Sequence, residues 1–122
     1  MELNEIQSFL NDELSKHAPL LRAKGAIPKP VEYAGTIPVM QGKQKVDGHY
    51  FASIVPKPKD IRLYFFPIYT HVQEYLELSD GLRKQLKGKS CFHIKNLDAS
   101  LKNEVSEMIA KGVSLYKTDG LI

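Results

Sequence analysis

The sequence has a single cysteine, Cys91, among its 122 residues. One cysteine excludes an intrachain disulfide, which is typical of proteins from a reducing compartment. No apolar run approaches the ~18 residues that a membrane-spanning helix needs. The first residues, Met1–Glu5, lack the basic and apolar regions of a signal peptide. We therefore expect a cytoplasmic protein that does not use a membrane as a partner.

The chain also lacks internal repeats, low-complexity segments and any stretch with the composition of a linker. Its length fits one domain of ordinary size, spanning residues 1–122. A chain of this size can bury one hydrophobic core without help from disulfides or metals. The sequence therefore predicts a single domain.

Strong charge of either sign is absent. The chain has 17 Lys and Arg against 14 Asp and Glu, a net charge of +3. A dedicated nucleic-acid binder usually concentrates more positive charge on one face. The charge therefore indicates a solvated surface with a small excess of lysine, and nucleic acid is not expected as a partner.

The most apolar and aromatic run, Ile61–Tyr69, predicts a core strand that ends at Pro67, since proline cannot donate to a sheet ladder. Alternation places Ile61, Leu63 and Phe65 on the buried face of this strand and Arg62, Tyr64 and Phe66 on the other. The run is expected to be the element on which the rest of the chain packs.

A second strand is expected at Tyr50–Val55, joined to the first by the turn sequence Pro56–Asp60 as an antiparallel hairpin. Strict alternation places Tyr50 with the residues at 52 and 54 on one face, and Phe51 with those at 53 and 55 on the other. The first of these two sets is expected to face the core.

The other elements follow from capping signals, apolar spacing and Gly or Pro stops. We expect a helix over residues 4–17 with Asn4 and Gln7 as a capping pair, one more helical turn over 20–24, and loops over 25–48 with a short edge strand at 36–40. After the hairpin we expect a helix from an N-cap at Thr70 to Leu78, and a short helix from Ser79 to Gly88. A strand over 91–94 and a last helix from Asp98 to Gly112 complete the chain. This order predicts an α+β fold with helices packed on an antiparallel sheet.

Two residues with reactive side chains, Cys91 and His93, are two apart and so share one face of their strand. An imidazole beside a thiol is one way to activate a cysteine nucleophile. The alternative is a buried small cysteine beside a hydrogen-bonded histidine. No third residue that would orient the histidine stands out in the sequence, so no catalytic residue is predicted.

Signals for cofactors are weak. The residues Gly88-Lys89-Ser90 match only the end of a phosphate-binding loop, because position 83 is Arg where that motif needs glycine. The four histidines have no metal-binding spacing, and no pair of carboxylates stands out. We expect neither a cofactor nor a metal site.

Two stretches together resemble a known family. Tyr50–Ile54 leading to Leu63–His71, followed by Leu86–Ile94 and an amphipathic helix, is similar in order and pattern to the YdhG-like family, a bacterial domain of unknown function. The resemblance covers about residues 30–117. It implies an α+β fold with a curved antiparallel sheet, an N-terminal helix and C-terminal helices packed on it. It implies no activity, since the family has no established catalytic residues.

Polar, basic and aromatic residues gather at the ends of these two stretches, which suggests a ligand-binding surface. The candidate residues are Arg62, Tyr64, His71, Lys89, Cys91 and His93. A pocket at the boundary between sheet and helices is the usual place for a small-molecule ligand. We therefore predict a non-catalytic ligand-binding or accessory domain.

Three alternatives stay open. One is a thiol-dependent enzyme or redox protein that uses Cys91, and another is a weak nucleic-acid accessory protein. A homodimer formed through an exposed sheet edge is also compatible with the sequence.

Overall fold

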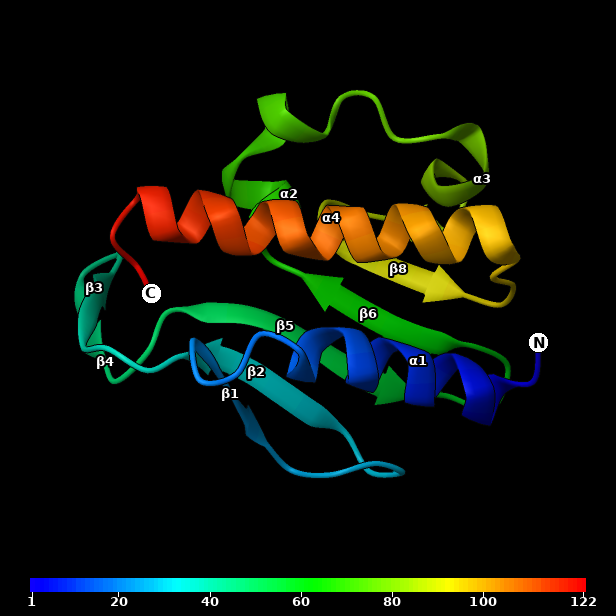
Figure 1. Cartoon of the computed structure of the whole chain (residues 1–122), viewed down its shortest axis with the longest axis horizontal. Helices are drawn as coiled ribbons and strands as arrows, with labels where there is room; N and C mark the ends of the chain where they lie inside the picture. The colour runs from blue at the N-terminus through cyan, green and yellow to red at the C-terminus, as the bar shows by residue number, and fades with distance from the viewer.

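The computed structural model describes all residues from Met1 to Ile122 and consists of a sheet layer and a helical layer (Figure 1). Six strands form an antiparallel sheet in the order β1-β2-β5-β6-β8-β7, and β3 and β4 form a separate hairpin. The elements in chain order are α1 (Leu3–Ser15), β1 (Leu21–Lys24), β2 (Val31–Gly35), β3 (Val39–Gln41), β4 (Gln44–Val46), β5 (Tyr50–Pro56), β6 (Ile61–Phe65), α2 (Pro67–Thr70), the 3-10 helix η1 (Val72–Tyr75), α3 (Asp80–Arg83), β7 (Leu86–Lys87), β8 (Cys91–Ile94) and α4 (Ala99–Thr118). The expected α+β class is confirmed.

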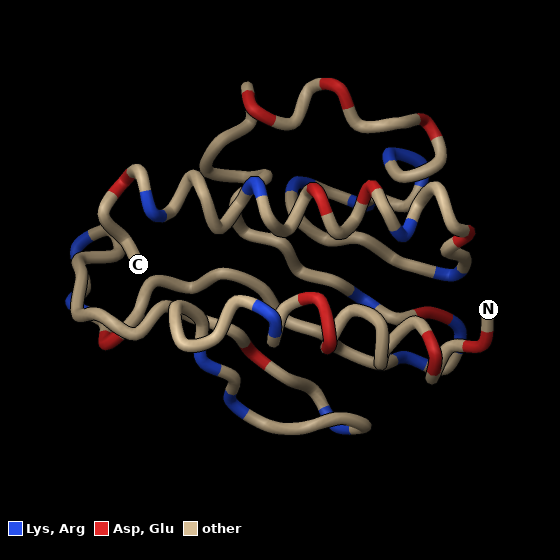
Figure 2. The backbone as a smooth tube through the Cα atoms, in the orientation of Figure 1, with Lys and Arg blue, Asp and Glu red and all other residues tan.

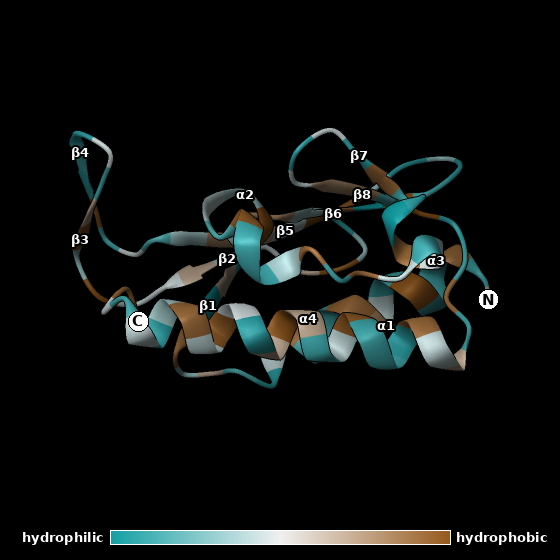
Figure 3. Cartoon of the chain, turned by 90° about the horizontal axis from the view of Figure 1, so that it is seen from above, coloured by the Kyte–Doolittle hydropathy of each residue, from teal (hydrophilic) through white to brown (hydrophobic).

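Strand β6 lies between β5 and β8, inside the sheet. Its side chains alternate as predicted, because Ile61, Leu63 and Phe65 are buried while Arg62 and Tyr64 are only half-buried. The buried side chains face α1 and α4, which lie along one face of the sheet (Figure 3). The run that begins at Ile61 is therefore a core strand, with both long helices packed over its apolar side.

The pairing of β5 with its neighbours corrects the predicted faces. The register between β2 and β5 shifts after Tyr33, so that Tyr33 pairs with Ala52 but Ala34 pairs with Tyr50. This bulge leaves Phe51 as the extra residue of β5. Phe51 and Ala52 are consequently both buried, and Tyr50 lies on the face away from the helices.

The two long helices differ from the prediction at their ends. Helix α1 is capped by Glu2 and Glu5 in a reciprocal capping box, not by Asn4 and Gln7. Helix α4 begins at Asp98 as predicted, since the Asp98 carboxylate accepts a hydrogen bond of 2.8 Å from the Leu101 amide.

The prediction that α4 ends at Gly112 was wrong. The helix continues to Thr118, and Gly112 lies where a helical residue must be small. A Cβ at this position would lie 2.9 Å from the Phe65 ring and 3.0 Å from Pro67. The glycine thus permits close packing of the helix on the sheet instead of stopping it.

The strands β1 and β2 replace a predicted helical turn and a predicted loop. Residues 21–24 pair with residues 32–35 in an antiparallel ladder, so the expected turn of helix there was wrong. The edge strand expected at 36–40 is β3, displaced to Val39–Gln41.

The segment after β6 also differs. Thr70 is the last residue of α2 and caps no helix, since Pro67 already opens α2. Ser79 does cap α3, but α3 ends at Arg83, and Leu86 belongs to the strand β7. Gly88 lies in the β7–β8 turn with a φ of +88°, a conformation that favours glycine.

Both edges of the sheet are short. One edge is β1, with four residues, and the other is β7, with two. Short edges that carry charged side chains, here Arg22, Lys24 and Lys87, discourage pairing with another chain. A homodimer stays a prediction.

None of the helices combines the length and the apolar character that crossing a membrane would require.

Candidate functional site

The side of the sheet away from α1 and α4, here called the open face, carries a row of side chains that crosses all six strands. Direct cross-strand pairing joins the members of this row from one edge to the other. In order they are Lys24, Glu32, Ser53, Tyr64, Cys91 and Lys87. The row is polar and aromatic and has a lysine at each end.

A second row lies beside the first, where Arg62 of β6 pairs with His93 of β8. Both side chains approach the carboxylate of Asp60 in the turn before β6. The Arg62 Nε donates to one Asp60 oxygen at 3.2 Å, and the His93 Nδ1 lies 3.9 Å from the other. Asp60 is buried, and its hydrogen bond fixes the orientation of Arg62, whereas the distance to His93 is too long for a hydrogen bond.

Four of the six residues predicted from sequence therefore meet on the open face: Arg62, Tyr64, Cys91 and His93. Lys89 lies close by in the β7–β8 turn, with its Nζ 5.7 Å from the centre of the Tyr69 ring. Lys89 thus lies beside α2, close to Cys91 in sequence and at the edge of the sheet, but in a pocket that none of the four residues lines.

His71 does not join them. Its Nε2 and an Asp119 oxygen are 2.7 Å apart, and its Nδ1 lies 2.7 Å from the Thr70 hydroxyl. These contacts tie the start of η1 to the C-terminal end of α4. His71 thus joins two elements of the helical layer and lies outside the candidate surface.

Sequence reasoning missed one aromatic residue of the open face, Tyr50. The β5 bulge places this ring 5.6 Å from Phe66, which in turn lies 5.7 Å from Tyr69. The Tyr50 hydroxyl forms a hydrogen bond of 2.7 Å with Ser53. A bulge leaves no clear mark in a sequence, so the alternation rule assigned Tyr50 to the wrong face.

The β3–β4 hairpin rises at one end of the open face (Figure 3). A pocket lies there, lined by residues of the hairpin and of β1 and β2. The pocket has a volume of about 560 Å³ and is mainly polar. Its cationic lining comes from Arg22, Lys24 and Lys45, and its anionic lining from Glu32 and Asp47. The pocket extends the open face beyond β1 and β2. The candidate surface is therefore a broad face with a recess at one end, whereas a small-molecule pocket at the boundary between sheet and helices was expected.

The charges of the chain are divided between the two layers. The segments that hold the strands, residues 21–65 and 86–94, carry ten Lys and Arg against three Asp and Glu, a net charge of +7. The remaining residues, which hold the helices, carry seven cationic against eleven acidic residues, a net charge of −4. Figure 2 shows the acidic residues along α1, α4 and the segment from α2 to α3. The mild net charge of +3 therefore conceals a basic sheet layer and an acidic helical layer.

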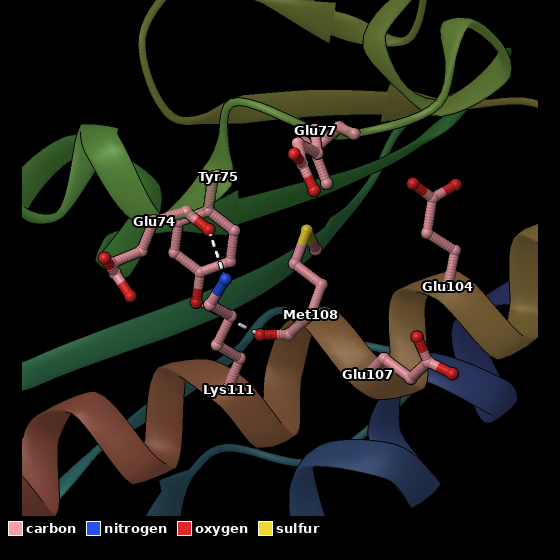
Figure 4. A pocket seen from close by; sticks show the side chains of 8 residues that line it. Glu74, Tyr75, Glu77, Glu104, Glu107, Met108 and Lys111 are labelled. Atoms are coloured by element: carbon pink, nitrogen blue, oxygen red, sulfur yellow. Dashed lines mark hydrogen bonds between the residues drawn. The ribbon is translucent and has the colours of Figure 1, made fainter.

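The acidity of the helical layer is greatest around a second pocket, of about 170 Å³, between η1 and α4 (Figure 4). Its lining includes four glutamates: Glu74, Glu77, Glu104 and Glu107. Lys111 donates to the Glu74 carbonyl oxygen there. The structure contains no group of three or more His, Cys, Asp or Glu side chains arranged to hold a metal ion.

The environment of Cys91 does not favour a reactive thiolate. Burial raises the pKa of the Cys91 thiol above its ordinary value, and the neighbouring Tyr64 hydroxyl and Arg62 guanidinium only oppose this in part. A nucleophilic cysteine needs the opposite shift, because the thiolate is the reactive form. The chemistry of this face is therefore better suited to binding than to thiol catalysis.

We expect Cys91 to react with iodoacetamide more slowly than free cysteine at neutral pH, because a raised pKa leaves less thiolate. Its rate should still be rising with pH where free cysteine has reached its plateau. The measurement is the loss of free thiol over time, with Cys91→Ser as the unreactive control since the chain has no other cysteine. A rate above that of free cysteine would support the thiol-enzyme alternative instead.

No protein-family model, curated protein or solved structure matches this chain. The structure alone therefore describes the class of protein. It is a two-layer α+β domain in which the helices cover one face of the sheet and leave a basic, aromatic face uncovered.

Proposed function

We propose that this protein is a non-catalytic binding domain that holds an extended anionic ligand on the open face of its sheet. The observation that supports this most is the meeting of Arg62, Tyr64, Cys91 and His93 on that face, within a layer of net charge +7. The similarity to the YdhG-like family stays a prediction and adds no activity to this proposal.

The shape of the face favours an extended ligand. Six strands at a spacing of about 4.8 Å give a face roughly 24 Å across. Side chains along it are half-buried or exposed, and its pockets lie at its margins: the recess under the hairpin, a pocket at the α3 side to which His93 contributes, and another beside α2 to which Lys89 contributes. Small ligands are usually enclosed much more fully.

Electrostatics favour an anion. The row across the strands has Lys24 at one end and Lys87 at the other, and both are exposed. Arg62 lies near the middle of the face, with its orientation fixed by Asp60. Cations spread over a face in this way match a ligand with charges repeated along its length.

Long-chain inorganic polyphosphate is a suitable probe, because it carries repeated charge and no other recognition group. We expect its addition to shift the backbone amide resonances of β5, β6 and β8 in ¹H–¹⁵N NMR spectra. In calorimetric titrations, the double variant Lys24→Gln/Lys87→Gln should lower the slope of log K against log salt by about 2, one for each lost contact.

The matched control is Lys102→Gln/Lys117→Gln, which removes the same charge from α4 in the helical layer. It should leave the slope nearly unchanged. Equal effects from the two double variants, or resonance shifts spread over both layers, would show that the net charge alone attracts the probe and would refute the proposal.

A further inference from the structure

We infer that the ligand of the open face is single-stranded nucleic acid, with bases stacked on the aromatic side chains of the face and phosphates held by the surrounding cations. The inference rests on the proposed function and adds the chemical class of the ligand. It is carried by two independent features: a series of aromatic rings that runs from the open face to the start of α2, and the separation of charge between the layers.

The rings form a connected group, here called the aromatic strip. Phe66 lies between Tyr50 and Tyr69, with ring centres 5.6 and 5.7 Å away. Tyr64 pairs directly with Ser53, to which the Tyr50 hydroxyl is hydrogen-bonded, so Tyr64 lies next to Tyr50 on the open face. The aromatic strip therefore consists of Tyr50, Tyr64, Phe66 and Tyr69 and spans the end of β6 and the start of α2.

These rings are available to a ligand. Tyr50, Tyr64 and Phe66 are half-buried, while Tyr69 has 48% of its surface exposed. Aromatic side chains on an uncovered antiparallel sheet are a common platform for nucleobases, since every base has a flat face to stack. A phosphate polymer without bases would make no use of them.

Cations accompany the aromatic strip along its length. Arg62 is next to Tyr64 on the same side of β6, and Lys89 lies over the ring of Tyr69. Arg22 and Lys24 lie beyond β5, toward the recess under the hairpin. A chain of nucleotides crossing the face would thus meet a stacking surface and phosphate partners together.

The net charge of +3 is too small for a typical nucleic-acid binder, but it is not spread evenly over the molecule. The sheet layer alone carries +7, and the acidic residues that reduce the total lie mainly on the helical layer. A single strand is favoured over a duplex because bases paired within a duplex are not free to stack on protein rings.

The test uses fluorescence anisotropy of a labelled oligothymidine of about 15 nucleotides, within the range of sites used by small single-strand binders. Tyr64→Thr introduces a β-branched residue, which suits a strand, and removes the ring; it should weaken oligothymidine binding about 5- to 150-fold. Tyr64→Phe retains the ring and should bind within about twofold of the unaltered protein. Far-UV circular dichroism would establish that both variants remain folded.

Polyphosphate separates this inference from the proposed function. If Tyr64→Thr weakens binding of oligothymidine but not of polyphosphate, bases are recognised and the inference stands. If polyphosphate binds at the open face while oligothymidine does not, or if Tyr64→Thr leaves oligothymidine binding unchanged, the ligand is another polyanion such as an acidic protein, and only the inference fails. Equal affinity for a duplex of the same length also overturns it. If neither probe binds at the open face, both the inference and the proposed function fail.

Discussion

Replacement of Tyr116 with alanine is expected to lower the free energy of unfolding by about 3–5 kcal/mol, the usual cost of removing a large buried aromatic side chain. The ring is fully buried in α4, where it meets Phe51 edge-on at 5.2 Å and His49 at 5.0 Å. Because small domains have only about 5–15 kcal/mol of stability in total, this single change would bring the protein close to unfolding. Urea denaturation followed by circular dichroism measures the loss.

The conservative variant Tyr116→Phe separates packing from hydrogen bonding. The Tyr116 hydroxyl donates to the Tyr50 carbonyl oxygen at 2.7 Å, and that oxygen also lies 3.1 Å from the His49 Nδ1. Loss of one of two partners should cost only about 0.5–1.5 kcal/mol. A loss as large as that of the alanine variant would show that the hydrogen bond, and not the ring, provides most of the stabilisation.

Replacement of Gly48 with alanine should be costly for a different reason. A Cβ at this position would lie only 1.8 Å from the carbonyl oxygen of Gly35. The clash is with backbone, so no side chain can rotate to relieve it, and the segment between β4 and β5 must shift. We expect a loss of about 1–3 kcal/mol, or more if the shift spreads into the ladder between β2 and β5.

The effect of Gly48→Ala should also reach the candidate surface, because Gly48 lies in the lining of the recess under the β3–β4 hairpin. Amide resonances of the hairpin should change, which NMR spectra would show. The comparison is Gly42→Asn at the tip of the hairpin: there φ is +63° and nothing lies near an added Cβ, and asparagine tolerates this conformation. Similar losses in thermal stability for the two variants would contradict the role assigned to close backbone contact.

Strong alternation allowed much of the sheet to be predicted. Ile61, Leu63 and Phe65 recur at every second position without interruption, and such a pattern has one consistent solution when one face is buried. The same rule failed at Tyr50, where a bulge inserts Phe51 and exchanges the faces of the residues before it. It also missed β2, whose short Val-Glu-Tyr alternation between Pro30 and Gly35 is easily mistaken for part of a loop.

The ends of helices were harder to predict than their existence. A glycine often marks the end of a helix, but Gly112 lies inside α4 and allows the helix to pack closely on Phe65 and Pro67. This contact depends on the tertiary structure and cannot be predicted from the local sequence. The candidate site shows a similar limit. Cys91 and His93 follow from strand geometry, but their pairing with Tyr64 and Arg62 depends on β8 lying beside β6. His71 was included because it is near in sequence, and the fold directs it to Asp119.

The division of charge between the layers makes the molecule a permanent electric dipole, with its positive end at the sheet layer. The layers are separated by roughly 10 Å, the usual thickness of a packed core, whereas the Debye length is about 8 Å at physiological ionic strength. An anion approaching the sheet is therefore screened from most of the charges of the helical layer. It responds more to the net charge of +7 on the sheet layer than to the net charge of +3 on the whole chain. The dipole would turn the open face toward a polyanion before contact, so that salt slows association more steeply than the charge of the whole chain indicates.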